Sequence, residues 1–357
     1  MRIAPAIFPL LLVVLVGCGG SEGPIAPVNE FPVVPQLESV AFALLGSGRV
    51  AFQRLGPPGS EYVATYVIDA TAARSWHMFD NTVAEGPAIS PDGRKITFMN
   101  FMGISATGWD VYLSKSDGTE VTQLTKLEGE GAASWSADGS KLVFPFAQGM
   151  HRNFFSQSPV VNATDLKQHT HFTADPGGHL ICPYLFGWED GASISSQGRI
   201  TFNCAATEID VLATDGTLAA AYVASRSDRS RFADVYMPQW SPDETKIAFL
   251  ELTWDVDATP LSVNGYALKL MNPDATNVTT IASGLINPAA KVQPGGTWSG
   301  PHNLSLCWMP DGSRIVFNLP EAQLVSHLWV VKADGTGLTQ LTSAPDVYDR
   351  SVSCSRS

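Results

Sequence analysis

The strongest constraint on the fold of this chain is a short hairpin sequence that recurs along it. In one copy, an extended run leads into Pro91-Asp92-Gly93, and the alternating strand Ile96-Thr97-Phe98 follows. Proline presets φ for a turn, aspartate can bond its own backbone, and glycine accepts a positive φ, so this pattern predicts a tight hairpin. Clear copies of it occupy residues 134–144, 239–249 and 307–317, and degenerate copies occupy 46–52 and 195–202.

The spacing of these hairpins predicts the architecture. The phenylalanine that closes each copy falls at positions 52, 98, 144, 202, 249 and 317. A repeat of about 40–50 residues with four strands is typical of one propeller blade. A second turn motif, Asp-Gly-Thr, recurs at 117–119 and 334–336 and supplies the turn between the third and fourth strands. We therefore predict an all-β fold over residues 38–357, a six-bladed β-propeller of four-stranded antiparallel blades.

The end of the chain leaves the blade count open between six and seven. Residues 350–354 look like a further first strand with no hairpin after it. Because an unpaired edge strand invites pairing with other chains, we expect this strand to complete the blade begun near Val50. If residues 39–42 already fill that place, the end strand lies elsewhere and seven blades become the alternative.

The Trp-Ser-Pro-Asp-Gly and Asp-Gly-Thr-x-x-x-Gln-Leu-Thr motifs resemble the repeats of TolB-like β-propellers, over about residues 38–357. Members of that family combine an α/β domain with a six-bladed propeller and bind lipoprotein and colicin peptides at the mouth of the channel. In this chain only a tether is expected before the repeats, which leaves no room for the α/β domain. The resemblance thus implies the fold and leaves the partner open.

The first 37 residues predict export and a lipid anchor. Residues 1–17 hold one positive charge, an apolar run from Ile7 to Val16 and a small-residue ending, which is typical of a secretory signal. The ending Leu15-Val16-Gly17-Cys18 resembles a bacterial lipobox, so we expect Cys18 to be lipidated and residues 18–37 to form a flexible tether. We expect the protein in the bacterial cell envelope, at the outer membrane, facing the periplasm or the cell surface.

Composition limits the partners. The formal net charge is −12, which argues against nucleic acid and against direct contact with an anionic membrane face. Four cysteines besides Cys18 permit two disulfides in an exported chain, with three possible pairings. The pairing that we favour joins Cys307 to Cys354, if the chain end closes the ring, and Cys182 to Cys204. Buried free thiols are the alternative.

One face of the predicted propeller carries the long connections, those from the second to the third strand and from each blade to the next. Acidic residues recur as the chain enters each innermost strand, so we predict a ring of carboxylates around this mouth of the channel, which would attract a basic peptide or a divalent cation. Ordinary solvated loop acids are the alternative. The predicted binding residues are Glu85, Glu130, Glu189, Asp190, Asp234, Tyr236, Trp254, His302 and Asp349, with Trp188 nearby.

A histidine-rich stretch raises a second possibility. His169 and His171 would lie on the same side of a strand and, with His179, could bind a transition metal. Some β-propeller lyases of the oligogalacturonate type use a histidine-rich metal site. Surface pairing of the two histidines is the alternative.

These observations leave two functions. We favour a monomeric, lipid-anchored binding module for a protein or peptide, which needs no cofactor and is not an enzyme. The alternative is a carbohydrate-binding or polysaccharide-lyase-like propeller with a histidine-bound divalent metal. The sequence has no Gly-x-Ser-x-Gly elbow and no glycine-rich phosphate loop before a helix.

Overall fold

Each clear copy of the recurrent turn joins two antiparallel strands in the structure of the protein, a computed structural model. The chain divides into two units, residues 1–33 and 34–357, and every described residue belongs to the second. The structure describes residues 37–56, 63–80, 84–100, 109–127, 131–148, 151–170, 192–204, 207–224, 231–255, 262–286, 304–322 and 325–356. In these ranges no helix is long and apolar enough to cross a membrane.

Four separate sheets have four strands each, paired in chain order and antiparallel throughout. They are β4 (Ala84–Ile89), β5 (Lys95–Asn100), β6 (Asp110–Lys115) and β7 (Thr122–Gln123); β8 (Ser134–Trp135), β9 (Leu142–Gln148), β10 (His151–Gln157) and β11 (Lys167–Gln168); β12 (Ala192–Ile194), β13 (Ile200–Cys204), β14 (Glu208–Leu212) and β15 (Leu218–Val223); and β16 (Arg231–Trp240), β17 (Ile247–Asp255), β18 (Ser262–Met271) and β19 (Thr279–Leu285).

The other eight strands form one sheet that contains two antiparallel sets. The two sets are joined by a single parallel pair, Ser326 with Tyr348. One set is β20 (Leu306–Trp308), β21 (Arg314–Ala322), β22 (Val325–Lys332) and β23 (Thr339–Gln340), and the other is β24 (Tyr348–Cys354), β1 (Arg49–Leu55), β2 (Val63–Asp69) and β3 (Arg74–Asp80). A short 3-10 helix, η1 (Phe42–Leu44), precedes β1.

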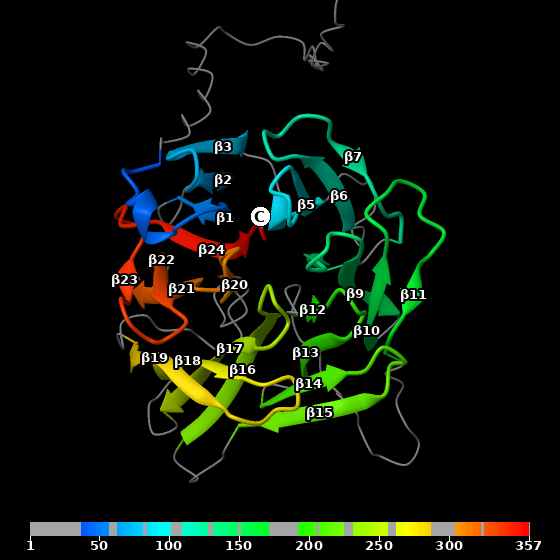
Figure 1. Ribbon diagram of the computed structural model, residues 1–357. Coiled ribbons are helices and arrows are strands. Elements are labelled where there is room, and N and C mark those ends of the chain that lie inside the picture. The colour runs from blue at the N-terminus through cyan, green and yellow to red at the C-terminus, as the bar shows by residue number, and fades with distance from the viewer. Residues whose placement is uncertain are drawn as a thin grey trace, which may run out of the picture. The chain divides into compact units, whose positions relative to one another are not determined.

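The sheets lie around a common centre, with one strand of each nearest to it (Figure 1). This is an all-β propeller with four-stranded antiparallel blades, as the repeat predicted. Apolar side chains fill the space between neighbouring blades: one buried cluster combines Ala88 and Val111 of the β4–β7 sheet with Trp135 and Phe144 of the β8–β11 sheet.

The turns owe their shape to the residues that the motif repeats. The Ser90 hydroxyl donates to the Asp92 carboxylate over 2.6 Å and accepts from the Lys95 amide over 2.9 Å. Gly93 has a φ of +68°, which a side chain would strain. The same serine–aspartate bond recurs in the turns at Ser136 and Ser241. These connections between the first and second strands of a blade are therefore short and rigid.

Two of the motif tryptophans, Trp135 and Trp308, connect the innermost strands of successive blades. The indole Nε1 of Trp135 donates to the carbonyl oxygen of Ala88 over 2.9 Å, and that of Trp308 donates to the carbonyl of Gln239 over 3.2 Å. In both cases the acceptor belongs to the blade before. Each tryptophan thus fixes the spacing of two blades around the channel.

The C-terminal strand closes the propeller, as expected. β24 pairs antiparallel with β1, and the register places Val50 opposite Cys354 and Arg54 opposite Asp349. Residues 39–42, the alternative occupant, form no strand, and Phe42 begins η1. A disulfide joins Cys307 of β20 to Cys354 of β24, with 5.4 Å between the Cα atoms. Cys18 and Cys182 lie outside the described residues, as does the side chain of Cys204.

Candidate functional site

The innermost strands enclose a cavity of about 90 Å³. It is lined by β4, β8, β16, β20 and β24, which contribute backbone, tryptophan rings and serine hydroxyls. Drug-sized ligands occupy pockets of roughly 300–1,000 Å³, so the space in this cavity suits a group of a few heavy atoms. Its lining includes Trp135, Gln239, Trp240, Trp308, Ser353 and Arg356.

The cavity ends, on the side of the short turns, at the residues that follow β24. The Ser355 amide donates to the carbonyl of Arg49, and the Arg356 amide donates to the carbonyl of Pro91, just after β4. The Arg356 guanidinium donates over 3.3 Å to the carbonyls of Trp240 and Ser241. Because β4 and β16 belong to different sheets that do not follow one another along the chain, Arg356 links strands across the end of the channel.

The other end of the channel is where the innermost strands begin. There Arg350 of β24 donates to the Gln53 side chain over 2.6 Å and lies 3.5 Å from the Glu85 carboxylate. Gln53 in turn donates to the carbonyl of Ala84 over 2.9 Å. Glu85 is only 12% exposed. This predicted binding residue therefore lies beside a buried cation of its own chain.

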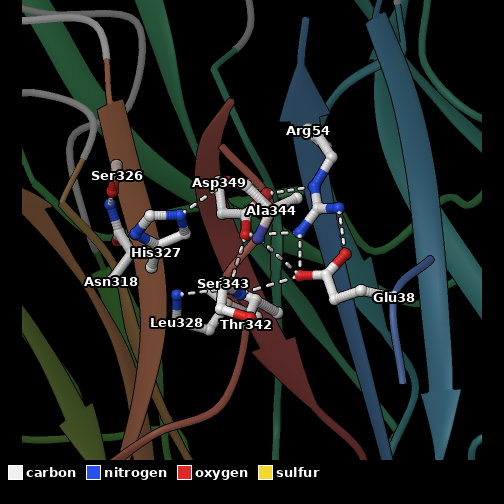
Figure 2. Close-up of polar contacts among 10 residues, drawn as sticks. All are labelled: Glu38, Arg54, Asn318, Ser326, His327, Leu328, Thr342, Ser343, Ala344 and Asp349. Carbon is white, nitrogen blue, oxygen red and sulfur yellow. Dashed lines mark hydrogen bonds and ion pairs between the residues drawn. The ribbon is translucent and has the colours of Figure 1, made fainter. Parts of the chain in front are cut away.

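Asp349, another predicted binding residue, is fully buried at the seam between β1 and β24 (Figure 2). Its carboxylate accepts two hydrogen bonds from Arg54, at 2.6 and 2.9 Å, and one from the Thr342 hydroxyl at 2.6 Å. Arg54 also pairs with Glu38 at 2.6 Å. Burial raises the pKa of Asp349, although Arg54 opposes this shift. Asp349 is thus part of the contact that closes the fold, and its carboxylate is bonded within the chain.

Glu38 and His327 extend this closure cluster, which we define as Glu38, Arg54, His327, Thr342 and Asp349. Burial raises the pKa of Glu38, but the bonds and charge of Arg54 outweigh it and hold the pKa at about 2. The Glu38 carboxylate also accepts from the amides of residues 343 and 344. His327 Nε2 lies 2.8 Å from the carbonyl of Ala344 (Figure 2). The closure cluster thus connects the segment before β1 with β22 and β24.

The structure brings Asp234, Tyr236 and Trp254 together on β16 and β17. The Asp234 carboxylate accepts from the Trp254 indole over 2.7 Å and from the Tyr236 hydroxyl over 3.1 Å. Burial, and then the charge of Asp234, raise the pKa of Tyr236. Both rings are buried, at 6% and 9% exposure, so they do not offer a stacking platform for a sugar.

His169 is a buried residue whose Nε2 lies 2.7 Å from the Ser156 hydroxyl. Burial, with the positive charges of Lys167 and Lys141, lowers its pKa to about 4, so the imidazole is neutral. Among the residues that the structure describes, no three acidic, histidine or cysteine side chains gather as a metal site would require. His171 and His179 lie outside these residues, as do Glu130, Trp188, Glu189, Asp190 and His302.

Sequence reasoning missed the three arginines around the channel, Arg54, Arg350 and Arg356. Arg54 and Arg350 lie at buried positions of β1 and β24, strands that also contain the charged residues Arg49 and Asp349, and a charged residue at a buried strand position signals a paired partner. Arg356 follows the last strand, where no periodic pattern indicates burial. The sequence therefore indicated the acids Glu85 and Asp349 but not the arginines that pair with them, Arg350 and Arg54.

No family model and no curated protein sequence matches this chain. Solved structures do resemble it. TolB from Acinetobacter baumannii aligns with a TM-score of 0.61 and 16% identity over 86% of this chain and 66% of the TolB chain. Hydrazine synthase from Kuenenia stuttgartiensis aligns with a TM-score of 0.55 and 11% identity over 86% of this chain and 46% of that one. The chain therefore spans slightly less than two thirds of the TolB structure, and it shares the β-propeller fold with these proteins.

Proposed function

We propose that this chain is an exported, lipid-anchored, six-bladed propeller that binds a protein or peptide at the mouth opposite the short turns. The observation that carries this proposal is the difference between the two ends of the channel. Arg356 and hydrogen-bonded turns occupy one end. The innermost strands β12 and β20 begin at the other end, and the stretches of sequence before them, residues 169–191 and 286–305, lie for the most part outside the described residues. Long connections on a rigid scaffold commonly carry function.

The blade count follows from the eight-stranded sheet. One parallel pair is a weak link between its two antiparallel sets, so we count each set as a blade and reach six. The structural likeness to TolB supports a binding propeller as the closest functional analogy, at the level of the fold.

The partner that we propose is a protein or peptide, bound by a monomer without a cofactor. Arg350 lies beside Glu85, and Arg54 neutralises Asp349, so attraction of a basic segment would depend on the predicted acids outside the described residues. Nucleic acid does not fit a chain of net charge −12.

Site-specific photo-crosslinking in cells tests the binding face. Leu285, at the end of β19, is 90% exposed on the proposed face, and Leu218, at the start of β15, is 57% exposed on the opposite one. A benzophenone residue at Leu285 should give a discrete protein adduct, and one at Leu218 should not. Adducts from Leu218 alone would reverse the face, and adducts from neither position would contradict protein binding.

The lipid anchor has its own test. Cys18→Ser should abolish labelling by radioactive palmitate and release the protein from the outer-membrane fraction. Export without labelling in the wild-type protein would contradict the anchor and leave the binding face to the crosslinking result.

A further inference from the structure

Arg356 lies at the end of the channel cavity and is mostly withdrawn from solvent. Its two described side-chain bonds go to the backbone carbonyls of Trp240 and Ser241, both at 3.3 Å. A guanidinium has five N–H donors in a planar fork. Among the described residues, these two long bonds to neutral oxygens use only two of the five donors.

The charge of Arg356 is not matched by an ion pair within the part of the chain that the structure describes. Burial lowers the pKa of Arg356 to about 10, and the charge of Glu244 offsets this only in part. The Glu244 carboxylate itself is bound by the Ser196 amide and lies 3.8 Å from Arg199. Arginine stays protonated at neutral pH, and buried charges in proteins are normally paired. This site therefore favours an anion.

The rest of the cavity suits a small carboxylate. The lining residues include Gln239, Ser134 and Ser353, whose side chains carry amide and hydroxyl groups, and Trp135 and Trp308, whose rings are largely apolar. A volume of about 90 Å³ admits a group of a few heavy atoms. Guanidinium groups bind carboxylates in a planar, bidentate geometry that this fork can supply.

We propose that the channel holds a carboxylate-binding site in which the Arg356 guanidinium, with Gln239 in the same cavity lining, binds a small organic acid or the carboxylate end of a peptide. The site lies at the closed end of the channel and is separate from the proposed protein-binding mouth. Because the whole protein has a net charge of −12, attraction of an anion to this site depends on the local charge of Arg356 and not on the electrostatic potential of the whole protein.

Acetate is the first probe. Trp135, Trp240 and Trp308 line the cavity, so binding should change tryptophan fluorescence saturably when acetate replaces chloride at constant ionic strength. Arg356→Gln should weaken acetate binding at least about tenfold, which is the effect expected for losing a charged hydrogen-bonding partner. Arg356→Lys keeps the charge without the fork and should bind with intermediate affinity.

Arg94→Gln provides the matched control, because Arg94 is an exposed arginine in a turn on the same face and does not line the cavity. It should bind acetate as the wild-type protein does. Circular dichroism establishes that each variant is folded. Equal acetate binding by wild type and Arg356→Gln, or no saturable response in wild type, would overturn the proposal.

Two peptides distinguish the source of the carboxylate. N-acetyl-triglycine with a free carboxylate should compete with acetate if peptide ends enter the cavity, and its C-terminal amide should not compete. Competition by neither peptide, with acetate binding intact, assigns the site to free organic acids. The Leu285 crosslinking experiment is scored separately, so loss of the anion site and loss of protein binding are distinguishable.

Discussion

Two places that hold this propeller together differ in chemistry, the packing between two blades and the strand pairing that closes the ring. Between the β4–β7 and β8–β11 sheets, apolar side chains and one indole hydrogen bond suffice. At the closure, where β1 meets β24, a buried ion pair lies inside the junction. The first junction joins residues 47 apart in sequence, and the second joins residues 295 apart. A repeat can use the same local packing at each step, whereas closure must select one particular pair of distant strands.

The selectivity of the closure follows from the cost of a wrong register. If β24 shifted by one residue along β1, Asp349 would no longer lie opposite Arg54, and a buried carboxylate would lose its partner. The neighbouring pair, Gln53 and Arg350, faces the next blade and adds a second polar requirement. Apolar residues alone would tolerate more shifts. We infer that the ion pair fixes the register and adds little to the net stability.

Breaking the closure pair should have the largest effect. Arg54→Leu leaves Asp349 and Glu38 without their cation, and removal of one partner of a buried pair typically costs about 3–5 kcal/mol in the free energy of unfolding. Denaturant unfolding at neutral pH measures it. The double variant Arg54→Leu with Asp349→Leu removes both charges from the junction and should recover much of that loss. A double variant as unstable as the sum of both single changes would contradict the register argument.

Breaking the ordinary junction should cost less. Trp135→Phe keeps an aromatic ring but leaves the buried carbonyl of Ala88 without the indole donor, a loss of about 1–2 kcal/mol in the free energy of unfolding. The control is Trp329→Phe, since the Trp329 indole donates to Glu321, whose side chain is 36% exposed. Water can replace that bond, so the control should lose less. Equal losses would show that ring packing, and not the hydrogen bond, joins the blades.

The same contrast explains what the sequence could predict. The turns depend on residues within five positions of each other, such as Ser90, Asp92 and Lys95. Their sequence pattern can therefore be recognised, and it predicts the geometry of the turn. The closing strand was also predictable, because an unpaired strand requires a partner. The role of Asp349 was not, because its position before a strand is typical of a solvated loop acid. Only the fold reveals that Arg54, 295 residues away, lies opposite it.

The candidate site was harder to predict for a related reason. Asp234, Tyr236 and Trp254 do lie together, yet they bond one another and bury both rings. Sequence spacing placed these residues near one mouth but could not determine which way the rings point. Arg356 gave no signal, since one arginine after a strand is normally a solvated residue.

The smallest effect should come from pH, through His327 of the closure cluster. Burial of His327 opposes protonation, but its contacts with Glu321, at 3.1 Å from Nδ1, and with the carbonyl of Ala344 outweigh burial and raise its pKa. A raised pKa means that protonation stabilises the folded state. This contribution is fully present below the unfolded value near 6.5 and is lost as pH rises through the folded value.

His327→Gln keeps a polar side chain without the charge and should remove this pH dependence. The difference in unfolding free energy between wild type and variant should therefore be largest at pH 5–6 and should shrink toward pH 9, over about the range in which a perturbed histidine titrates. His77→Gln is the control, because it changes a histidine on β3 and leaves the closure intact. If the difference in unfolding free energy instead grew with rising pH, His327 would be neutral in the folded protein. The closure would then depend on the Arg54–Asp349 pair and not on protonation of His327.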